Sequence, residues 1–198
     1  MEYKIIYHDE SDFLKQAAQL HYESLSYRSF ITSFGENFLY QLYKGILQTH
    51  IGFFACAIQD NQLKGFILGC FNSSKLILVV VKRLYIFFPL IISRIIKNPA
   101  LMIKLYETLR YTNRSDERIR SELLVIAVKE NYRSRGIGTF LLKLLEDEFK
   151  KYEIVIYKVT VHKDMHRSND FYVKTGMKFL KTFYLSNLHW NVYVKNIE

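Results

Sequence analysis

The stretch Arg133-Ser-Arg-Gly-Ile-Gly138 places two arginines and two glycines directly before a segment with helical periodicity. Glycines let the backbone approach a ligand closely, and the N–H groups at a helix N-terminus point at an anion. The wholly apolar run LLVIAV, residues 123–128, lies just before this turn and predicts a buried strand. A strand, a basic glycine turn and a helix in this order predict a site for a phosphate-bearing ligand.

Two familiar phosphate loops do not fit this turn. A P-loop requires a lysine after its last glycine, but Thr139 follows Gly138. The dinucleotide-binding fingerprint requires a third glycine where this chain has Leu141. A purely conformational role, in which the glycines only permit a tight turn, stays open as an alternative.

Two longer segments resemble one family. Residues 128–138, VKENYRSRGIG, followed by a helix, resemble the acyl-CoA-binding motif of the GNAT superfamily of acetyltransferases: Arg or Gln, two residues, Gly, one residue, then Gly or Ala. Residues 168–179, SNDFYVKTGMKF, resemble a second GNAT stretch, in which a Phe-Tyr pair precedes Lys-x-Gly-Phe; here Met177 replaces the Phe. The resemblance implies an acetyl-CoA-dependent N-acetyltransferase with no metal ion.

The resemblance also implies roles for individual residues. The pantetheine arm of coenzyme A would pair with Ile126, Ala127 and Val128, and the Ile126 N–H would bond to the thioester carbonyl. Tyr172 would be the general acid for the leaving thiolate, and Glu122 the base for the amine. The pyrophosphate would lie on the turn formed by Arg133, Ser134, Arg135, Gly136, Ile137, Gly138 and Thr139.

Each role has a plainer alternative. Tyr172 could be an aromatic side chain packed on the sheet, and Glu122 a solvated charge at a strand end. Glu122 precedes Ile126 by four residues, about 13 Å of extended strand, so contact needs a bulge, the reach of the substrate or a water. Met165 stands where many relatives have Asn, so that coenzyme contact is either missing here or supplied by Asn169. His162 and His166 lack a third ligand at metal spacing, so zinc is not expected.

The elements around these residues predict a mixed α/β sheet with helices on both faces, the GNAT acyl-CoA N-acyltransferase fold, in a single domain over residues 1–198. KIIYH, GFFACAI, LKGFILGCF, residues 122–128, IVIYKVTV, KFLKTFYL and HWNVYV have the composition of strands. Residues 11–25 and 36–47 and the segment after Gly138 show helical periodicity, and Gly176 ends a short helix.

An apolar and basic insertion, residues 72–116, precedes the fourth strand. Its longest uncharged run, residues 84–93, is far shorter than the ~20 residues that cross a bilayer. We expect Pro89 and Pro99 to divide it into short helices. Either the apolar faces of these helices cover the sheet, or residues 75–104 dock peripherally on an anionic membrane or on a lipid-linked substrate.

Composition limits the remaining classes. The 198 residues carry 28 Lys and Arg against 19 Asp and Glu, so the chain attracts anions. The basic residues gather in the turn and the insertion, with no DNA-binding motif, so no nucleic acid partner is expected. The two cysteines lie in apolar runs, and the first residues do not resemble a secretory signal. We therefore expect a cytoplasmic protein, with the inner membrane face as a peripheral location.

The acceptor is expected to be a small-molecule amine. In the GNAT fold the segment SYRSFITSFG and the insertion would line its side of the site, with Tyr27, Arg28 and Phe30 as candidate contacts. The helices LHYESLSYRSF and GENFLYQLY resemble GNAT proteins associated with surface sugars, which favours an amino sugar on a nucleotide or lipid carrier. Protein and peptide amines, polyamines and antibiotics stay open, as does a catalytically silent CoA-binding module.

Overall fold

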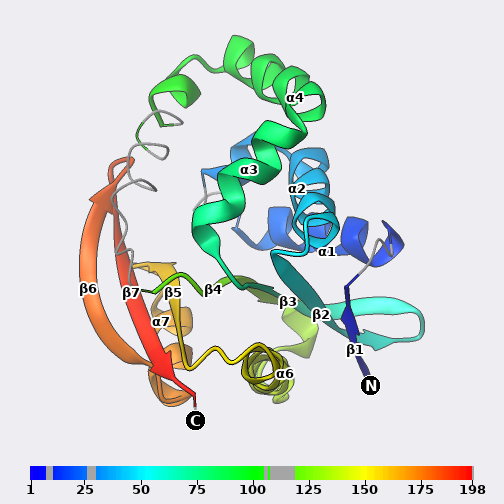
Figure 1. Ribbon diagram of the computed structural model, residues 1–198, viewed down its shortest axis with the longest axis vertical. Helices are drawn as coiled ribbons and strands as arrows, with labels where there is room; N and C mark the ends of the chain where they lie inside the picture. Colours follow the sequence, from blue (N-terminus) through cyan, green and yellow to red (C-terminus); the bar gives the residue numbers. More distant parts are fainter. Residues whose placement is uncertain (8–10, 26–29, 105–106, 108–118, 198) are drawn as a thin grey trace.

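The structure is a computed structural model, which describes residues 1–7, 11–25, 30–104, 107 and 119–197. A seven-stranded mixed sheet, with strand order β1-β2-β3-β4-β5-β7-β6, runs through the described residues (Figure 1). Its strands are β1 (Glu2–Ile6), β2 (Gly52–Gln59), β3 (Gln62–Cys70), β4 (Glu122–Val128), β5 (Ile156–His162), β6 (Lys178–Leu185) and β7 (Leu188–Asn196).

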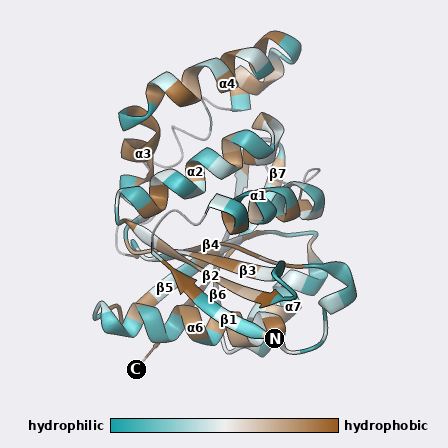
Figure 2. Cartoon of the chain, turned by 90° about the vertical axis from the view of Figure 1, so that its right-hand side faces the viewer, coloured by the Kyte–Doolittle hydropathy of each residue, from teal (hydrophilic) through white to brown (hydrophobic). Residues whose placement is uncertain are grey.

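Helices cover both faces of this sheet. On one side α1 (Ser11–Leu25) and α2 (Glu36–Gln48) pack on the strands, and α6 (Ile137–Lys151) lies on the opposite side (Figure 2). The central strands β2 and β3 are buried on both faces, which explains their almost continuous apolar sequences. Neighbouring side chains enter different cores: Phe54 packs towards α1 and α2, whereas Phe53 packs edge-on against Phe149 of α6.

The order of elements confirms the predicted GNAT fold class. Each strand predicted from sequence is present, and α7 (His166–Lys174) ends before Gly176, whose φ of +85° suits glycine. The two free cysteines, Cys56 and Cys70, are fully buried, as expected for small core residues.

β4 leaves its parallel neighbour soon after the two strands meet. β4 and β5 share only two registered pairs, Glu122 with Lys158 and Leu123 with Val159. On its other edge β4 pairs with β3 along its whole length, except that Leu124 has no partner there. Leu124 is therefore the extra residue of a β-bulge, which bends β4 at the point where it parts from β5.

The insertion folds differently from the first of the two expectations. α3 (Leu76–Lys82) and α4 (Leu84–Lys97) pack mainly on α2 and on the 3-10 turn η1 (Ile31–Phe34) rather than across the sheet (Figure 1). The anchor is Phe87, whose ring lies 5.0 Å from that of Phe38. Most other apolar side chains of α3 and α4 are exposed.

The expected break at Pro89 is also wrong. Pro89 lies inside α4, and the two helices are instead separated at Arg83, with a bend of 91°. Arg83 donates hydrogen bonds to the backbone carbonyl and the side-chain oxygen of Gln41 in α2, which fixes the corner. Pro99 does follow the end of α4, as predicted. Residues 105–106 and 108–116 of the insertion lie outside the described residues.

Candidate active site

Beyond Leu123 the edge of β4 that faces away from β3 has no strand partner among the described residues. Lys129 follows the last registered pair of β3 and β4, and its N–H donates to the carbonyl of Lys64. The N–H of Lys129 therefore points towards β3. Backbone groups of successive strand residues point to opposite edges, so the N–H and C=O of Ile126 and Val128 point to the edge where β5 has departed. An extended ligand with amide groups can pair with this edge.

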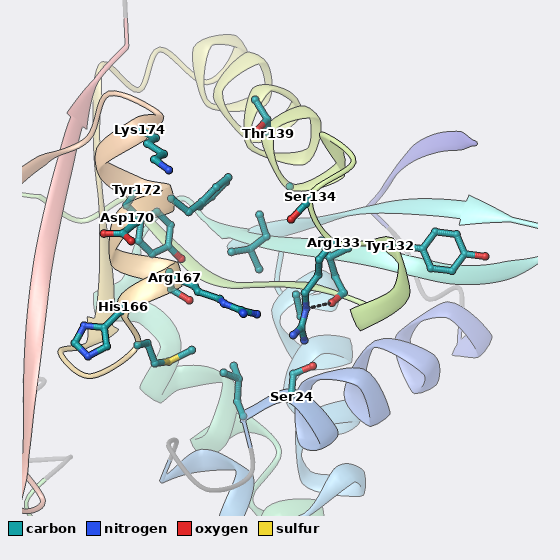
Figure 3. A pocket seen from close by; sticks show the side chains of 18 of the residues that line it. Ser24, Tyr132, Arg133, Ser134, Thr139, His166, Arg167, Asp170, Tyr172 and Lys174 are labelled. Atoms are coloured by element: carbon teal, nitrogen blue, oxygen red, sulfur yellow. Dashed lines mark hydrogen bonds between the residues drawn. The ribbon is translucent and has the colours of Figure 1, made fainter.

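A cavity of about 1220 Å³ opens at this edge. Its walls come from the end of α1, from β4, from the glycine turn and the start of α6, and from α7 (Figure 3). The predicted residues that line it are Ile126, Ala127, Val128, Arg133, Ser134, Gly136, Gly138, Thr139 and Tyr172. The structure thus brings most of the predicted cofactor residues and the predicted acid to one cavity.

The glycine turn has the conformation that its sequence predicts. Gly136 is the N-cap of α6 with φ +79°, in the left-handed region, although a Cβ there would meet nothing within 4 Å. Glycine is therefore needed at this position for its backbone conformation, and not to leave room for a neighbouring atom. The N–H groups of Ile137, Gly138 and Thr139 lie in the first turn of α6, where no helical carbonyl precedes them as a partner. No acidic residue occupies this first turn, so the helix end favours an anion.

The two arginines of the turn do different things. The Nε of Arg133 donates a 3.0 Å hydrogen bond to the carbonyl of Val128, which holds this guanidinium over the end of β4. Arg135 lies on the ring of Tyr132, 5.4 Å from its centroid, and does not line the cavity. Ile137 is also outside the lining, because its side chain is buried in the core beneath α6; only its backbone can serve the turn.

Tyr172 lines the cavity with most of its ring buried. Its ring packs on Phe171 and Tyr193, at centroid distances of 5.5 and 6.1 Å. Burial raises the pKa of Tyr172 well above its ordinary value. Among the described residues, none forms a hydrogen bond with its hydroxyl. A phenol that stays protonated and faces the cavity can donate a proton to a leaving group.

Glu122 does not line the cavity; it lies at the end of β4 that still pairs with β5. The Oγ1 of Thr160 is 3.4 Å from one carboxylate oxygen, and the Nζ of Lys158 is 3.9 Å from the other. Burial raises the pKa of Glu122, while Lys158 and the hydroxyls of Ser73 and Thr160 oppose that rise. A bulge in β4, a long substrate or a bridging water would each let Glu122 act near Ile126. β4 has such a bulge, at Leu124 between the two residues.

The contact predicted for Asn169 is not supported by its geometry. Its Nδ2 donates to the carbonyls of Met165, His162 and Lys163, and its Oδ1 accepts from Asn191 and from the hydroxyl of Tyr193. All of its polar atoms are engaged inside the protein, and it does not line the cavity. Asn169 thus fixes the start of α7 to β5 and β7 rather than binding a cofactor.

Sequence reasoning missed several lining residues on α7 and α1. Arg167 and Arg133 extend towards each other from opposite sides of the cavity (Figure 3). Met165, His166 and Lys174 also line it, as do Ser24 and Leu25 at the end of α1. Basic residues at both ends of α7 were the available signal for an anion-binding wall.

The acceptor residues Tyr27 and Arg28 lie outside the described residues, and Phe30 packs edge-on against Phe34 rather than in this cavity. In the described part of the chain no group of three or more His, Cys, Asp or Glu side chains could hold a metal ion. His162 packs edge-on against Trp190.

Comparisons with known proteins agree with this geometry. The model of the acetyltransferase (GNAT) family matches residues 14–177. The structure is similar to the PaiA N-acetyltransferase of Thermoplasma acidophilum, solved in complex with coenzyme A, with a TM-score of 0.62 and 19% identity over 99% of both chains. A ribosomal-protein-alanine N-acetyltransferase from Brucella melitensis gives a TM-score of 0.63 at 14% identity over 99% of both chains.

An aminoglycoside 6'-acetyltransferase type Ii gives a TM-score of 0.64 at 14% identity, over 100% of this chain and 98% of that one. No curated protein gives a significant sequence match. Identities this low indicate the fold, whereas the family model covers most of the sequence. The chain therefore belongs to the GNAT family of acetyltransferases.

Proposed function

We propose that this protein transfers the acetyl group of acetyl-CoA to a primary amine by direct attack of the amine on the thioester carbonyl. The observation that carries the proposal is the free edge of β4, Ile126 to Val128, which opens into the same cavity as the first turn of α6 and Tyr172. An extended, amide-bearing arm and a diphosphate need these two kinds of backbone donor next to each other.

The residues present fit acetyl-CoA. The cavity of about 1220 Å³ is large enough for an extended cofactor, and it runs along β4 to the glycine turn. Unpaired N–H groups at the start of α6 would hold the pyrophosphate, with Arg167 and Lys174 adding positive charge from α7. The Val128 carbonyl already accepts from Arg133, which leaves its N–H for the pantetheine arm.

The chemistry divides among three groups of this chain. The N–H of Ile126 would donate to the thioester carbonyl oxygen, where negative charge develops as the new N–C bond forms. Glu122, with its raised pKa, would take the proton of the amine, through a water or a substrate group, because it lies beyond the cavity lining. Tyr172 would give its proton to the sulfur as the C–S bond breaks.

For the acceptor we propose an amino sugar on a nucleotide or lipid carrier. The support is the resemblance of the first two helices to GNAT proteins associated with surface sugars, together with the position of Ser24 and Leu25 in the cavity wall. The proposed location is cytoplasmic, at or near the inner membrane face.

The test is release of free thiol from acetyl-CoA across a panel of amines, including amino sugars, peptides, polyamines and aminoglycosides. Neither cysteine should disturb a thiol reagent, because Cys56 and Cys70 are fully buried and burial raises the pKa of Cys70 to about 12. We expect one amine class to accelerate thiol release, and Tyr172→Phe to lower kcat by about 10²-fold while acetyl-CoA binding is kept. Binding of acetyl-CoA without amine-dependent thiol release from any class would instead identify a silent CoA-binding module.

A further inference from the structure

The largest feature that the proposed function leaves unexplained is the outward face of the insertion. We call it the α3–α4 surface and define it by its exposed apolar side chains: Ile77, Leu78, Val81, Leu84, Tyr85, Phe88, Ile92, Ile96, Met102 and Ile103. Tyr85 and Ile96 are 78% and 75% exposed. Contiguous apolar surface of this kind marks an interaction site in a folded protein.

This surface is not needed to hold the helices in place. Val79 is the buried residue of α3 and Phe87 that of α4. Phe87 joins a small cluster with Phe34 and Phe38, and Arg83 bonds to Gln41. Each helix thus docks on α2 through a narrow stripe, and most of the exposed side chains of the two helices are apolar.

The charges on the same segment have one sign. Lys75, Lys82, Lys97 and Lys104 are exposed along it, whereas the guanidinium of Arg94 lies against Gly35 at the start of α2. The sequence contains no Asp or Glu from residue 61 to residue 106, although the whole chain has 19. A water-facing helix pair ordinarily mixes both signs of charge, so a purely basic rim around an apolar face favours an anionic partner.

We propose that the α3–α4 surface docks on the surface of an anionic lipid bilayer. Apolar side chains of an amphipathic helix enter the boundary between headgroups and acyl chains, while its lysines and arginines contact anionic headgroups. α4 has 14 residues, about 21 Å of helix, and can lie flat in this boundary. The single-sign rim matches such a surface over both helices.

A second copy of this chain fits the surface less well. Two copies that met through this face would bring the same basic rims together, because a twofold interface places like surface against like. Spanning the bilayer also fits poorly: within the described residues no single helix is long and apolar enough. The segments Ser73–Lys82 and Leu84–Lys97 reach that criterion only together, and they are bent by 91°.

One end of the insertion also lies next to the candidate base. Ser73, three residues before α3, contacts Glu122 through its hydroxyl. A lipid-linked acceptor would then arrive at the side of the sheet where the candidate base lies. This last link rests on the proposed function, whereas docking itself does not require catalysis.

The experiment is cosedimentation of the full chain with phosphatidylcholine vesicles, with and without about 30% phosphatidylserine. We expect binding to the anionic vesicles, at least tenfold weaker binding to the neutral ones, and a similar loss at roughly 0.5 M NaCl. Val81→Glu, at a site 57% exposed, should lower binding about tenfold, whereas Val155→Glu, at a site 67% exposed beside α6, should change it less than about twofold. Lys82→Glu should weaken binding, and Lys150→Glu on α6 should not.

The possible outcomes separate cleanly. Equal binding of the Val81 and Val155 variants, or no preference for anionic vesicles, would overturn the proposal. A concentration-dependent dimer that Val81→Glu dissociates, without vesicle binding, would assign the surface to a second copy instead. Thiol release with soluble amines tests the proposed function separately, so a failure of membrane docking would not imply a failure of acetyl transfer, nor the reverse.

Discussion

The carboxylate of Glu122 lies 3.9 Å from the ammonium nitrogen of Lys158, at the first of the two positions where β4 and β5 are still in register. Both side chains are largely buried, so each strongly affects the charge of the other. The lysine stabilises the ionised form of Glu122, and burial opposes it with the larger effect. This balance sets the pH at which Glu122 could accept a proton.

Replacing Lys158 should therefore move the pH dependence of acetyl transfer. In Lys158→Met the counter-charge is lost and burial remains, so the pKa of Glu122 rises further. The base is active when ionised, so the acidic limb of the kcat/KM profile should move to higher pH. Glu122→Gln should remove this limb. An identical limb in wild type and Lys158→Met would show that another group is the base.

The raised pKa of Tyr172 bears on the alkaline side of the pH dependence of acetyl transfer. Burial raises the pKa of Tyr172 well above its ordinary value of 10.0, so the phenol keeps its proton throughout the neutral and moderately alkaline range. A general acid acts while protonated, so kcat should show no fall up to about pH 9.5. A descending limb below that pH, absent from Tyr172→Phe, would mean that the hydroxyl ionises more readily than its burial implies.

The two glycines of the turn should respond differently to alanine. At Gly136 the φ of +79° disfavours any side chain, so Gly136→Ala should cost about 1–2 kcal/mol and weaken acetyl-CoA binding. At Gly138 a Cβ would lie 3.5 Å from the ring of Phe171, an ordinary contact, so Gly138→Ala should be almost neutral. Urea unfolding and calorimetric titration with acetyl-CoA measure both effects. Equal losses in the two variants would contradict this conformational explanation.

Asn169 should matter for stability more than for cofactor binding. Asn169→Ala would leave the buried hydroxyl of Tyr193 and the amide of Asn191 without their acceptor, at a cost of roughly 2–4 kcal/mol. Its neighbour Ser168 lines the cavity instead, so Ser168→Ala is the control, and it should unfold almost as wild type does. A stable Asn169→Ala protein with weakened acetyl-CoA binding would restore the cofactor role first expected of it.

His21 should make the fold sensitive to mild acid. It is buried beside the hydroxyl of Tyr43, and burial lowers the pKa of His21 to about 4 from 6.5. Below the ordinary pKa the unfolded chain binds a proton that the folded chain excludes, so stability is complete above about pH 6.5 and declines towards pH 4. The expected loss between pH 7 and 5 is about 2 kcal/mol. His21→Gln should lose that much less over the same range in urea titrations.

Much of the fold follows from local periodicity. The runs in β2 and β3, the helical stripe of α6 and the stop at Gly176 are each determined by near neighbours in sequence, so they were predictable. The turn from Arg133 to Thr139 was predictable for the same reason. Its glycine and helix start are local features, and they lie where the motif placed them.

The misplaced features depend on contacts between distant segments. The guanidinium of Arg135 lies over the ring of Tyr132, outside the cavity. Asn169 faces inwards because Asn191 and Tyr193 of β7 donate hydrogen bonds to its side-chain oxygen. The corner at Arg83 depends on Gln41 in α2, whereas Pro89 fits within α4. Such choices need the three-dimensional neighbours, which a single sequence pattern does not contain.

The bulge in β4 makes the length of that strand as important as its composition. If Leu124 were deleted, the pairs Val125 with Leu68 and Leu123 with Gly69 would become consecutive, so β4 would lose its bulge and its bend while its side chains kept their sheet faces. Substitutions that keep seven residues from 122 to 128 leave the bulge in place. A single-codon deletion at Leu124 should therefore straighten β4 alongside β5 and weaken acetyl-CoA binding, even though every remaining residue keeps its identity.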